Sequence, residues 1–215
     1  MRTITSITSK DTITSTLVNQ VMEGSDYPYY YSVITFGYFD NLGIKLPPST
    51  IRKFWDKEET IKTARRLHRA LHETFNMDGI WTFCERHEDQ LDEDGEVMSK
   101  GRFHLNIITS NIKDHIVEEP KYKVKRLMYD ENRMHIPIKD MVYNDVVDLK
   151  IALIDSCIMR ASDWVNQYQH SIKTQLLEEP IDLDDTVRYC LKEYVKGKTD
   201  FTDVVLFKAS DFYKP

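Results

Sequence analysis

The sequence predicts an α+β protein with one central antiparallel sheet and helices packed mainly on one face of it. Three observations lead to this class. Segments with the two-residue alternation of strands are interspersed irregularly with amphipathic helical segments. Two of the strand-like segments are joined by a polar loop, which is typical of an antiparallel hairpin. The 215 residues, 41% of them hydrophobic and 30% charged, are enough for a single domain with a sizeable core.

The individual elements follow from apolar spacing and from turn residues. Alternating or β-branched runs predict strands at residues 29–39, 80–87, 101–110, 172–179 and 203–207. Apolar residues three and four positions apart predict helices at residues 58–75, 145–168 and 182–197. Residues 1–26 are rich in Ser and Thr, so we expect a loose or strand-like arm before a single domain at 27–215. Residues 121–129 form either a basic strand or part of an insertion at about 111–150.

Composition and charge exclude several classes of protein. Three scattered cysteines indicate a reducing compartment and argue against a disulfide framework or a cysteine zinc site. A net charge of −6 argues against non-specific coating of nucleic acid, although a local basic patch is compatible with it. No apolar run approaches the roughly 20 residues of a membrane span, so we expect no membrane partner.

Polar side chains interrupt two of the predicted strands. In GRFHLNIITS (101–110), strand alternation puts His104 and Asn106 on one face, and Glu85 lies on one face of the preceding strand. If the hairpin sets Glu85 beside His104, a carboxylate, an imidazole and an amide meet, which suits Mg²⁺ or Mn²⁺. Alternatively, His104 is a hydrogen-bonded core histidine and Asn106 a polar edge residue. His87 is either a fourth donor or an exposed histidine at the strand end.

The helix at 182–197 separates an apolar stripe from a polar face. The stripe comprises five residues that should be buried: Leu183, Val187, Cys190, Leu191 and Tyr194. Tyr189 lies opposite, one turn from Lys192. Tyr189 is either an ordinary half-exposed tyrosine or a nucleophile whose negative charge Lys192 offsets.

An ordered set of short motifs resembles the HUH endonuclease superfamily, which includes the Rep nickases that initiate rolling-circle replication. Their first motif is similar to VITFGYF (33–39), and their paired metal ligands on a strand to His104-Leu105-Asn106. Their acidic ligand, often followed two residues later by histidine, matches Glu85, and their Tyr-x-x-Lys helix matches Tyr189 to Lys192. The resemblance spans roughly residues 29–197, and Asn106 stands where the family has His or Gln.

This resemblance implies a ferredoxin- or RRM-like, HUH-type sheet and a metal-dependent DNA endonuclease and nucleotidyltransferase. Tyr189 would attack single-stranded DNA to leave a 5′-phosphotyrosine and a free 3′-OH, assisted by Lys192. Glu85, His104 and Asn106 would hold Mg²⁺ or Mn²⁺. The partner would be single-stranded DNA at the origin of a plasmid, phage or virus, with a host polymerase or helicase as further candidates. The candidate DNA contacts are basic: Arg65, Arg66, Arg69, Lys121, Lys123, Lys125 and Arg126.

The resemblance leaves the biological setting open. The protein would act in the cytoplasm of a bacterial or archaeal host, or in the nucleus if it comes from a eukaryotic virus. No helicase domain is expected, because Gly197-Lys198-Thr199 lacks the upstream glycine of a phosphate-binding loop. A single-tyrosine transposase or mobilisation relaxase would use the same chemistry on a different DNA. A third possibility is an inactive origin-binding protein that has lost its metal through Asn106.

Overall fold

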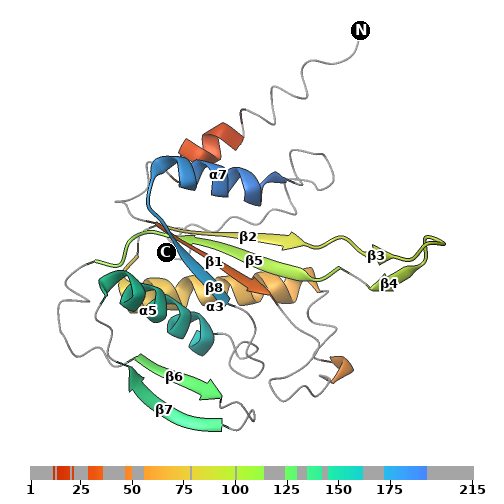
Figure 1. The fold of residues 1–215 in the computed structure, drawn as a ribbon. Coiled ribbons are helices and arrows are strands. Elements are labelled where there is room, and N and C mark those ends of the chain that lie inside the picture. The colour runs from red at the N-terminus through yellow and green to blue at the C-terminus, as the bar shows by residue number, and fades with distance from the viewer. Residues whose placement is uncertain are drawn as a thin grey trace.

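The computed structural model describes residues 12, 14–19, 21, 29–35, 47–49, 56–77, 79–99, 101–113, 124–129, 135–141, 145–161 and 172–192. Figure 1 shows the arrangement of these residues. The elements in chain order are β1 (Tyr29–Thr35), α3 (Lys57–Phe75), β2 (Ile80–Arg86), β3 (Gln90–Leu91), β4 (Val97–Ser99), β5 (Phe103–Thr109), β6 (Val124–Tyr129), β7 (His135–Met141), α5 (Val146–Ala161), β8 (Ile172–Leu177) and α7 (Pro180–Cys190).

A four-stranded sheet in the order β2-β5-β1-β8 forms the centre of the molecule. Each neighbouring pair of strands is antiparallel. Along the chain, α3 connects β1 to β2 and α5 lies between β5 and β8. The α+β class and the antiparallel sheet are therefore confirmed. The strands at 29–39, 80–87, 101–110 and 172–179 are also confirmed, apart from residues 36–39, which lie outside the described residues.

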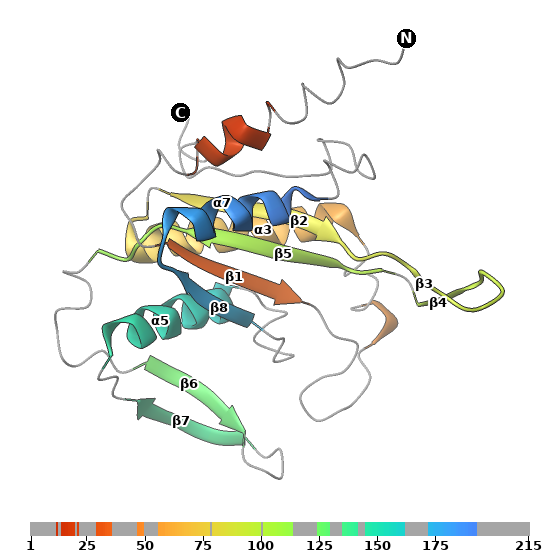
Figure 2. The same cartoon turned by 45° about the horizontal axis from the view of Figure 1, so that its top comes forward.

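Helices cover both faces of this sheet, whereas the sequence predicted helices mainly on one face. Figures 1 and 2 show α3 and α5 on one side and α7 with the short helical segment at residues 14–19 on the other. The reason lies in the strands, which are apolar on both faces. One row, including Ile34, Leu105 and Ile107, packs with the α3 and α5 side chains, and the opposite row, including Phe83 and Ile108, packs with α7. A strand that is buried on both faces needs a cover on each.

Helix α3 is fixed at both ends by specific hydrogen bonds. The side chain of Asp56 caps its start by accepting the backbone N–H of Glu59 at 3.1 Å. Asn76 ends the helix in the left-handed conformation and donates its N–H to the His72 carbonyl. His68 is fully buried, and its Nε2 lies 2.6 Å from the carbonyl oxygen of Ile80. This contact ties the helix to the first residue of β2.

Two peripheral segments differ from the sequence-based expectations. Residues 14–19 are helical, and Val18 and Val21 are buried against the α7 side of the sheet, where a loose or strand-like arm was expected. β6 is the expected candidate strand, and it pairs with β7, which was not predicted, in a separate two-stranded hairpin. The predicted strand at 203–207 lies outside the described residues. None of the helices in the described part of the chain is long and apolar enough to cross a membrane.

The β3–β4 hairpin continues β2 and β5 beyond the sheet (Figure 1). At its base, Asp89 accepts hydrogen bonds from Arg86 and from the backbone N–H of Gly101, both at 2.7 Å. Gly101 approaches the backbone just after β2 so closely that a Cβ there would lie 1.7 Å from the carbonyl oxygen of His87. The sequence at this point therefore requires glycine.

Candidate functional site

Strand register brings the predicted polar residues of β2 and β5 together. Glu85 pairs directly with His104, and Asn106 pairs with Phe83 one step along the same face. His104 and Asn106 therefore lie on one face, as the strand alternation predicted. All three polar side chains lie on the face that α7 covers, where Phe83 belongs to the apolar cluster. His104 is 5% exposed and Asn106 is 1% exposed, so both need hydrogen-bond partners within the protein.

The carboxylate of Glu85 is the common partner of these side chains. Nε2 of His104 lies 3.1 Å from its Oε2, and Nδ2 of Asn106 donates to the same oxygen at 3.1 Å. The other oxygen, Oε1, lies 3.1 Å from Nζ of Lys192. Two donors from β5 and one from Lys192, two residues beyond the end of α7, thus converge on one carboxylate of β2.

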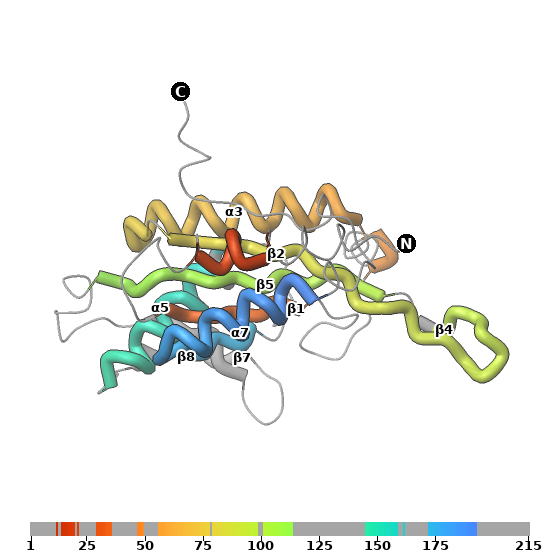
Figure 3. The backbone as a smooth tube through the Cα atoms, turned by 90° about the horizontal axis from the view of Figure 1, so that it is seen from above, coloured from red at the N-terminus to blue at the C-terminus, as the bar shows by residue number. Residues whose placement is uncertain are grey.

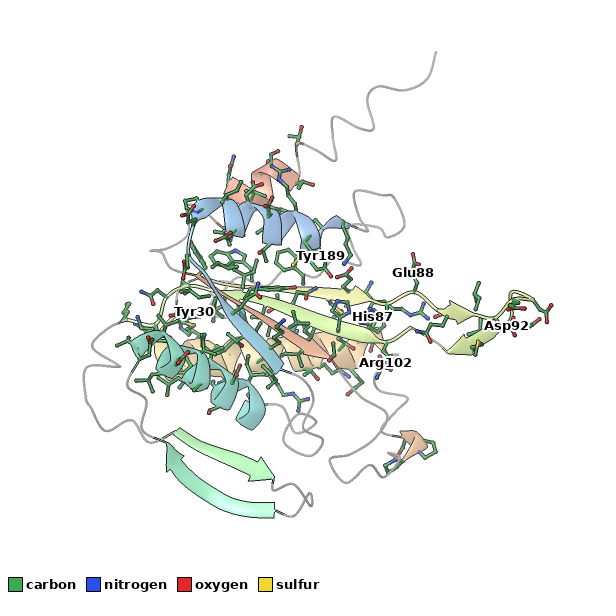
Figure 4. The ribbon with its side chains drawn as sticks, viewed as in Figure 1. Tyr30, His87, Glu88, Asp92, Arg102 and Tyr189 are labelled. Atoms are coloured by element: carbon green, nitrogen blue, oxygen red, sulfur yellow. The ribbon has the colours of Figure 1, made fainter. Side chains whose placement is uncertain are left out.

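The rotation of α7 about its own axis determines which of its side chains face the sheet and which are exposed. Leu183, Val187, Cys190 and Leu191 are buried, as the predicted stripe requires, whereas Tyr194 lies outside the described residues. Tyr189 is 53% exposed. Figure 3 views the molecule from the α7 side, and Figure 4 shows Tyr189 between α7 and the β2–β5 part of the sheet.

Lys192 connects the tyrosine to the carboxylate. Its ammonium lies 3.6 Å from the centre of the Tyr189 ring while it is ion-paired with Glu85. The predicted nucleophile and the predicted acidic ligand therefore share one cation. This contact joins α7 to β2, two elements that are far apart in the sequence.

The site is electrostatically coupled. Burial raises the pKa of Glu85, but its hydrogen bonds and electrostatic interactions with His104 and Lys192 outweigh burial, so this pKa lies below its ordinary value. Partial burial lowers the pKa of Lys192, but its interactions with Tyr189 and Glu85 outweigh that and leave it raised. Each charge stabilises the other, so Glu85 is held as a carboxylate and Lys192 as an ammonium.

Two residues of the site were not predicted from the sequence. The hydroxyl of Tyr31, on β1, donates to Oδ1 of Asn106 at 2.8 Å. Burial raises the pKa of Tyr31 and of Cys190 on α7, and the nearby Cys190 adds to the rise at Tyr31. Strand alternation places Tyr31 on the same face of β1 as Val33, and Val33 pairs with Asn106 of β5. The sequence alone does not show that β1 pairs with β5, so the contact between Tyr31 and Asn106 could not be predicted from it.

His87 extends the site toward the hairpin (Figure 4). Its ring stacks on that of His104, with centroids 4.2 Å apart and 20° between the planes. Burial and the neighbouring His104 lower the pKa of His87. Nδ1 of His104 is buried and has no hydrogen-bond partner among the described residues. His87 thus packs on His104, and no hydrogen bond joins it to Glu85 in the described part of the chain.

The donor set is compatible with a hard or borderline divalent cation. Glu85 and His104 could supply a carboxylate oxygen and an imidazole nitrogen, which lie 3.1 Å apart. Asn106 could supply an amide oxygen, although the amide atom that faces Glu85 in this structure is Nδ2. Among the described residues, no group of three or more His, Cys, Asp and Glu side chains could hold a metal ion. A set of three metal ligands at this site therefore has to include the amide of Asn106.

The predicted DNA contacts are spread over other parts of the molecule. Arg65, Arg66 and Arg69 lie on α3, which packs on the opposite face of the sheet from Glu85. Arg69 is paired with Glu73 of its own helix at 2.7 Å. Lys125 and Arg126 lie in β6, whereas Lys121 and Lys123 lie outside the described residues. A role of these residues in DNA binding stays a prediction.

Comparison with known proteins adds no identification. The chain matches no protein-family model, no curated protein and no solved structure.

Proposed function

We propose that this chain nicks and rejoins single-stranded DNA through a covalent bond to Tyr189, as an initiator of rolling-circle replication of the HUH type. The observation that supports this most directly is the contact of Lys192 with both Tyr189 and Glu85. It puts a phenol, a cation and a carboxylate with two further polar ligands in one place. The setting would be the cytoplasm of a bacterial or archaeal host, or the nucleus in the case of a eukaryotic virus.

The topology of the sheet supports the same proposal. A β-α-β-β-α-β order with strands arranged β2-β5-β1-β8 is compatible with the ferredoxin-like arrangement expected for this superfamily. In this arrangement His104 and Asn106 lie on the central strand β5 and Glu85 on its neighbour β2. The additional cover from residues 14–19 leaves Tyr189 half exposed, so a strand of DNA can reach it.

The proposed reaction exchanges one phosphodiester for another. Tyr189 gives up its phenol proton as its oxygen attacks phosphorus in line with the 3′-oxygen. The bond from phosphorus to tyrosine forms, the bond from phosphorus to the 3′-oxygen breaks, and the 3′-oxygen takes up a proton. Lys192 lies where it can offset the negative charge of the phenolate and of the phosphate. The covalent bond keeps the phosphodiester energy, so attack by a 3′-OH reverses the step and rejoins DNA without ATP.

A divalent cation, Mg²⁺ or Mn²⁺, is the proposed cofactor. Glu85, His104 and Asn106 would hold it, and its chemistry is to polarise the phosphate and favour in-line attack. Lys192 would then be freed from part of its pairing with Glu85. The remaining tasks fall to the protein: Tyr189 supplies the nucleophile, and the buried stripe of α7 fixes the position of that helix.

The test is formation of a covalent adduct. A pool of fluorescent single-stranded oligonucleotides is incubated with the protein and Mn²⁺, and the products are separated under denaturing conditions. We expect a protein–DNA adduct with the wild type and none with Tyr189→Phe, because the variant lacks the attacking oxygen.

Tyr29→Phe is the matched control. It removes a buried tyrosine hydroxyl from the same side of the sheet, one that donates to the Val21 carbonyl at 2.9 Å. This variant should form the adduct, as should Tyr194→Phe. An adduct with Tyr189→Phe would place the nucleophile elsewhere, and no adduct with any DNA or cation would reject the nickase.

A non-enzymatic origin-binding protein is the second candidate, and the orientation of Asn106 favours it. Its Nδ2 rather than its oxygen faces Glu85, and its Oδ1 accepts a hydrogen bond from Tyr31. In that arrangement Asn106 links β5 to β2 and β1 without ligating a metal. DNA binding that is retained without Mn²⁺ and without any adduct would support this candidate. A transposase or relaxase would pass the adduct test and would differ in the DNA that it cleaves.

A further inference from the structure

Tyr31 is the side chain that faces the amide oxygen of Asn106. Its hydroxyl is buried and donates a hydrogen bond to Oδ1 of Asn106, and Cys190 of α7 is close enough to affect its pKa. Because Asn106 is 1% exposed, its amide must satisfy both ends against these neighbours. One end meets Glu85 and the other end meets Tyr31. The orientation of the amide is therefore set by which partner donates and which accepts.

The two partners of Asn106 are not equivalent. The Glu85 carboxylate can only accept, so it draws the Nδ2 end of the amide toward itself. A tyrosine hydroxyl can both donate and accept, so Tyr31 is able to pair with either end of the amide. If Nδ2 were turned toward Tyr31, the hydroxyl would accept this bond and its proton could point to Sγ of Cys190, a weak acceptor. The reversed orientation keeps a hydrogen bond to Tyr31 and gives up the one to Glu85, and it directs Oδ1 toward Glu85 and His104, where a bound cation would replace the lost bond.

We propose that Tyr31 is a positioning residue that allows Asn106 to reverse its amide and to act as an oxygen ligand when a divalent cation binds. This inference rests on the cation site of the proposed function and explains how an amide can serve where the superfamily has His or Gln. In this role the Tyr31 hydroxyl forms a hydrogen bond with the end of the Asn106 amide that faces away from the cation. The loss of such a supporting hydrogen bond costs about 10- to 100-fold in metal affinity.

The experiment measures Mn²⁺ binding to the full chain in the absence of DNA, by the loss of the free Mn²⁺ signal in electron paramagnetic resonance. Tyr31→Phe should weaken Mn²⁺ binding by about 10- to 100-fold. Tyr29→Phe removes a comparable buried hydroxyl from the same strand and should bind Mn²⁺ like the wild type. Thermal unfolding of both variants shows whether either change acts through the fold instead.

A second background separates orientation from general damage. In Asn106→Asp both ends of the side chain are oxygens, so no reversal is needed, and Tyr31→Phe removes only the supporting hydrogen bond and should weaken Mn²⁺ binding less than it does with Asn106 in place. An equal loss in both backgrounds would overturn the positioning role. Wild-type affinity in Tyr31→Phe, or no Mn²⁺ binding by the wild type, would also overturn it.

The adduct assay keeps this inference distinct from the proposed function. An adduct on Tyr189 together with wild-type Mn²⁺ affinity in Tyr31→Phe rejects the inference and leaves the nickase standing. Weakened Mn²⁺ binding in Tyr31→Phe with no adduct from the wild type supports the inference and rejects the nickase.

Discussion

At the scale of single residues, the site is organised around one carboxylate. Glu85 has two oxygens and three donors, which come from β5 and from the end of α7. The pairing of Glu85 with His104 could be predicted from strand alternation and from the hairpin loop. The contact of Tyr31 with Asn106 could not, because it depends on β1 lying next to β5, and the two residues are 75 positions apart in the sequence.

Gly101 should matter for the site although it has no side chain. Gly101→Ala would put a Cβ 1.7 Å from the His87 carbonyl oxygen, so the backbone next to the stacked His87 and His104 rings must shift. We expect a lower melting temperature and weaker Mn²⁺ binding.

Gly95→Ala is the comparison for Gly101→Ala. Gly95 has a φ of +83°, and nothing lies within 4 Å of the position that a Cβ would take there. The cost is therefore backbone strain of about 1–2 kcal/mol, confined to the hairpin tip. Calorimetry and Mn²⁺ titration of both variants test the difference. Equal Mn²⁺ binding by Gly101→Ala and the wild type would show that this close approach does not support the site.

At the scale of elements, strong periodic patterns were predictive and weak ones were not. The helix at 58–75 has apolar residues at regular spacing, and α3 covers the same residues to within one position. Residues 14–19 have few large apolar side chains, and their helix depends on burying Val18 and Val21 against the sheet. Such a helix is stabilised by tertiary packing more than by local preference, and single-sequence patterns do not contain that information.

The start of α3 gives a test at this scale. Asp56→Ala removes the acceptor for the Glu59 N–H and should lower the free energy of unfolding by about 1 kcal/mol. Asp56→Asn keeps an acceptor oxygen at the same position and should lose less. Urea unfolding of the two variants measures the difference, and equal losses would mean that the charge of Asp56 matters more than the cap.

At the scale of the whole molecule, one sheet separates two apolar clusters with different roles. The cluster on the α3 and α5 side contains no residue of the candidate site, whereas the cluster on the α7 side surrounds it. The sequence predicted the four strands of this sheet but placed the helices mainly on one face. It therefore missed that the helix of Tyr189 and the helices of the main core lie on opposite sides.

This division predicts that two similar core variants differ in function. Leu183→Ala in α7 and Leu71→Ala in α3 each truncate a fully buried leucine, and each should cost about 2–5 kcal/mol in stability. Only Leu183→Ala should also weaken Mn²⁺ binding and adduct formation, because only α7 positions Lys192 against Glu85. Assays well below the melting temperature of both variants test this. Equal functional losses would indicate that the two clusters behave as one.

The placement of Trp81 has a practical consequence. Its indole is 5% exposed, packs in the cluster beneath α7 and lies 6.1 Å from the Tyr29 ring. If α7 moved away from the strands, this indole would enter water, and its fluorescence would shift to longer wavelength. The fluorescence of Trp81 therefore reports, without an added label, whether α7 is packed against the strands that carry Glu85 and His104.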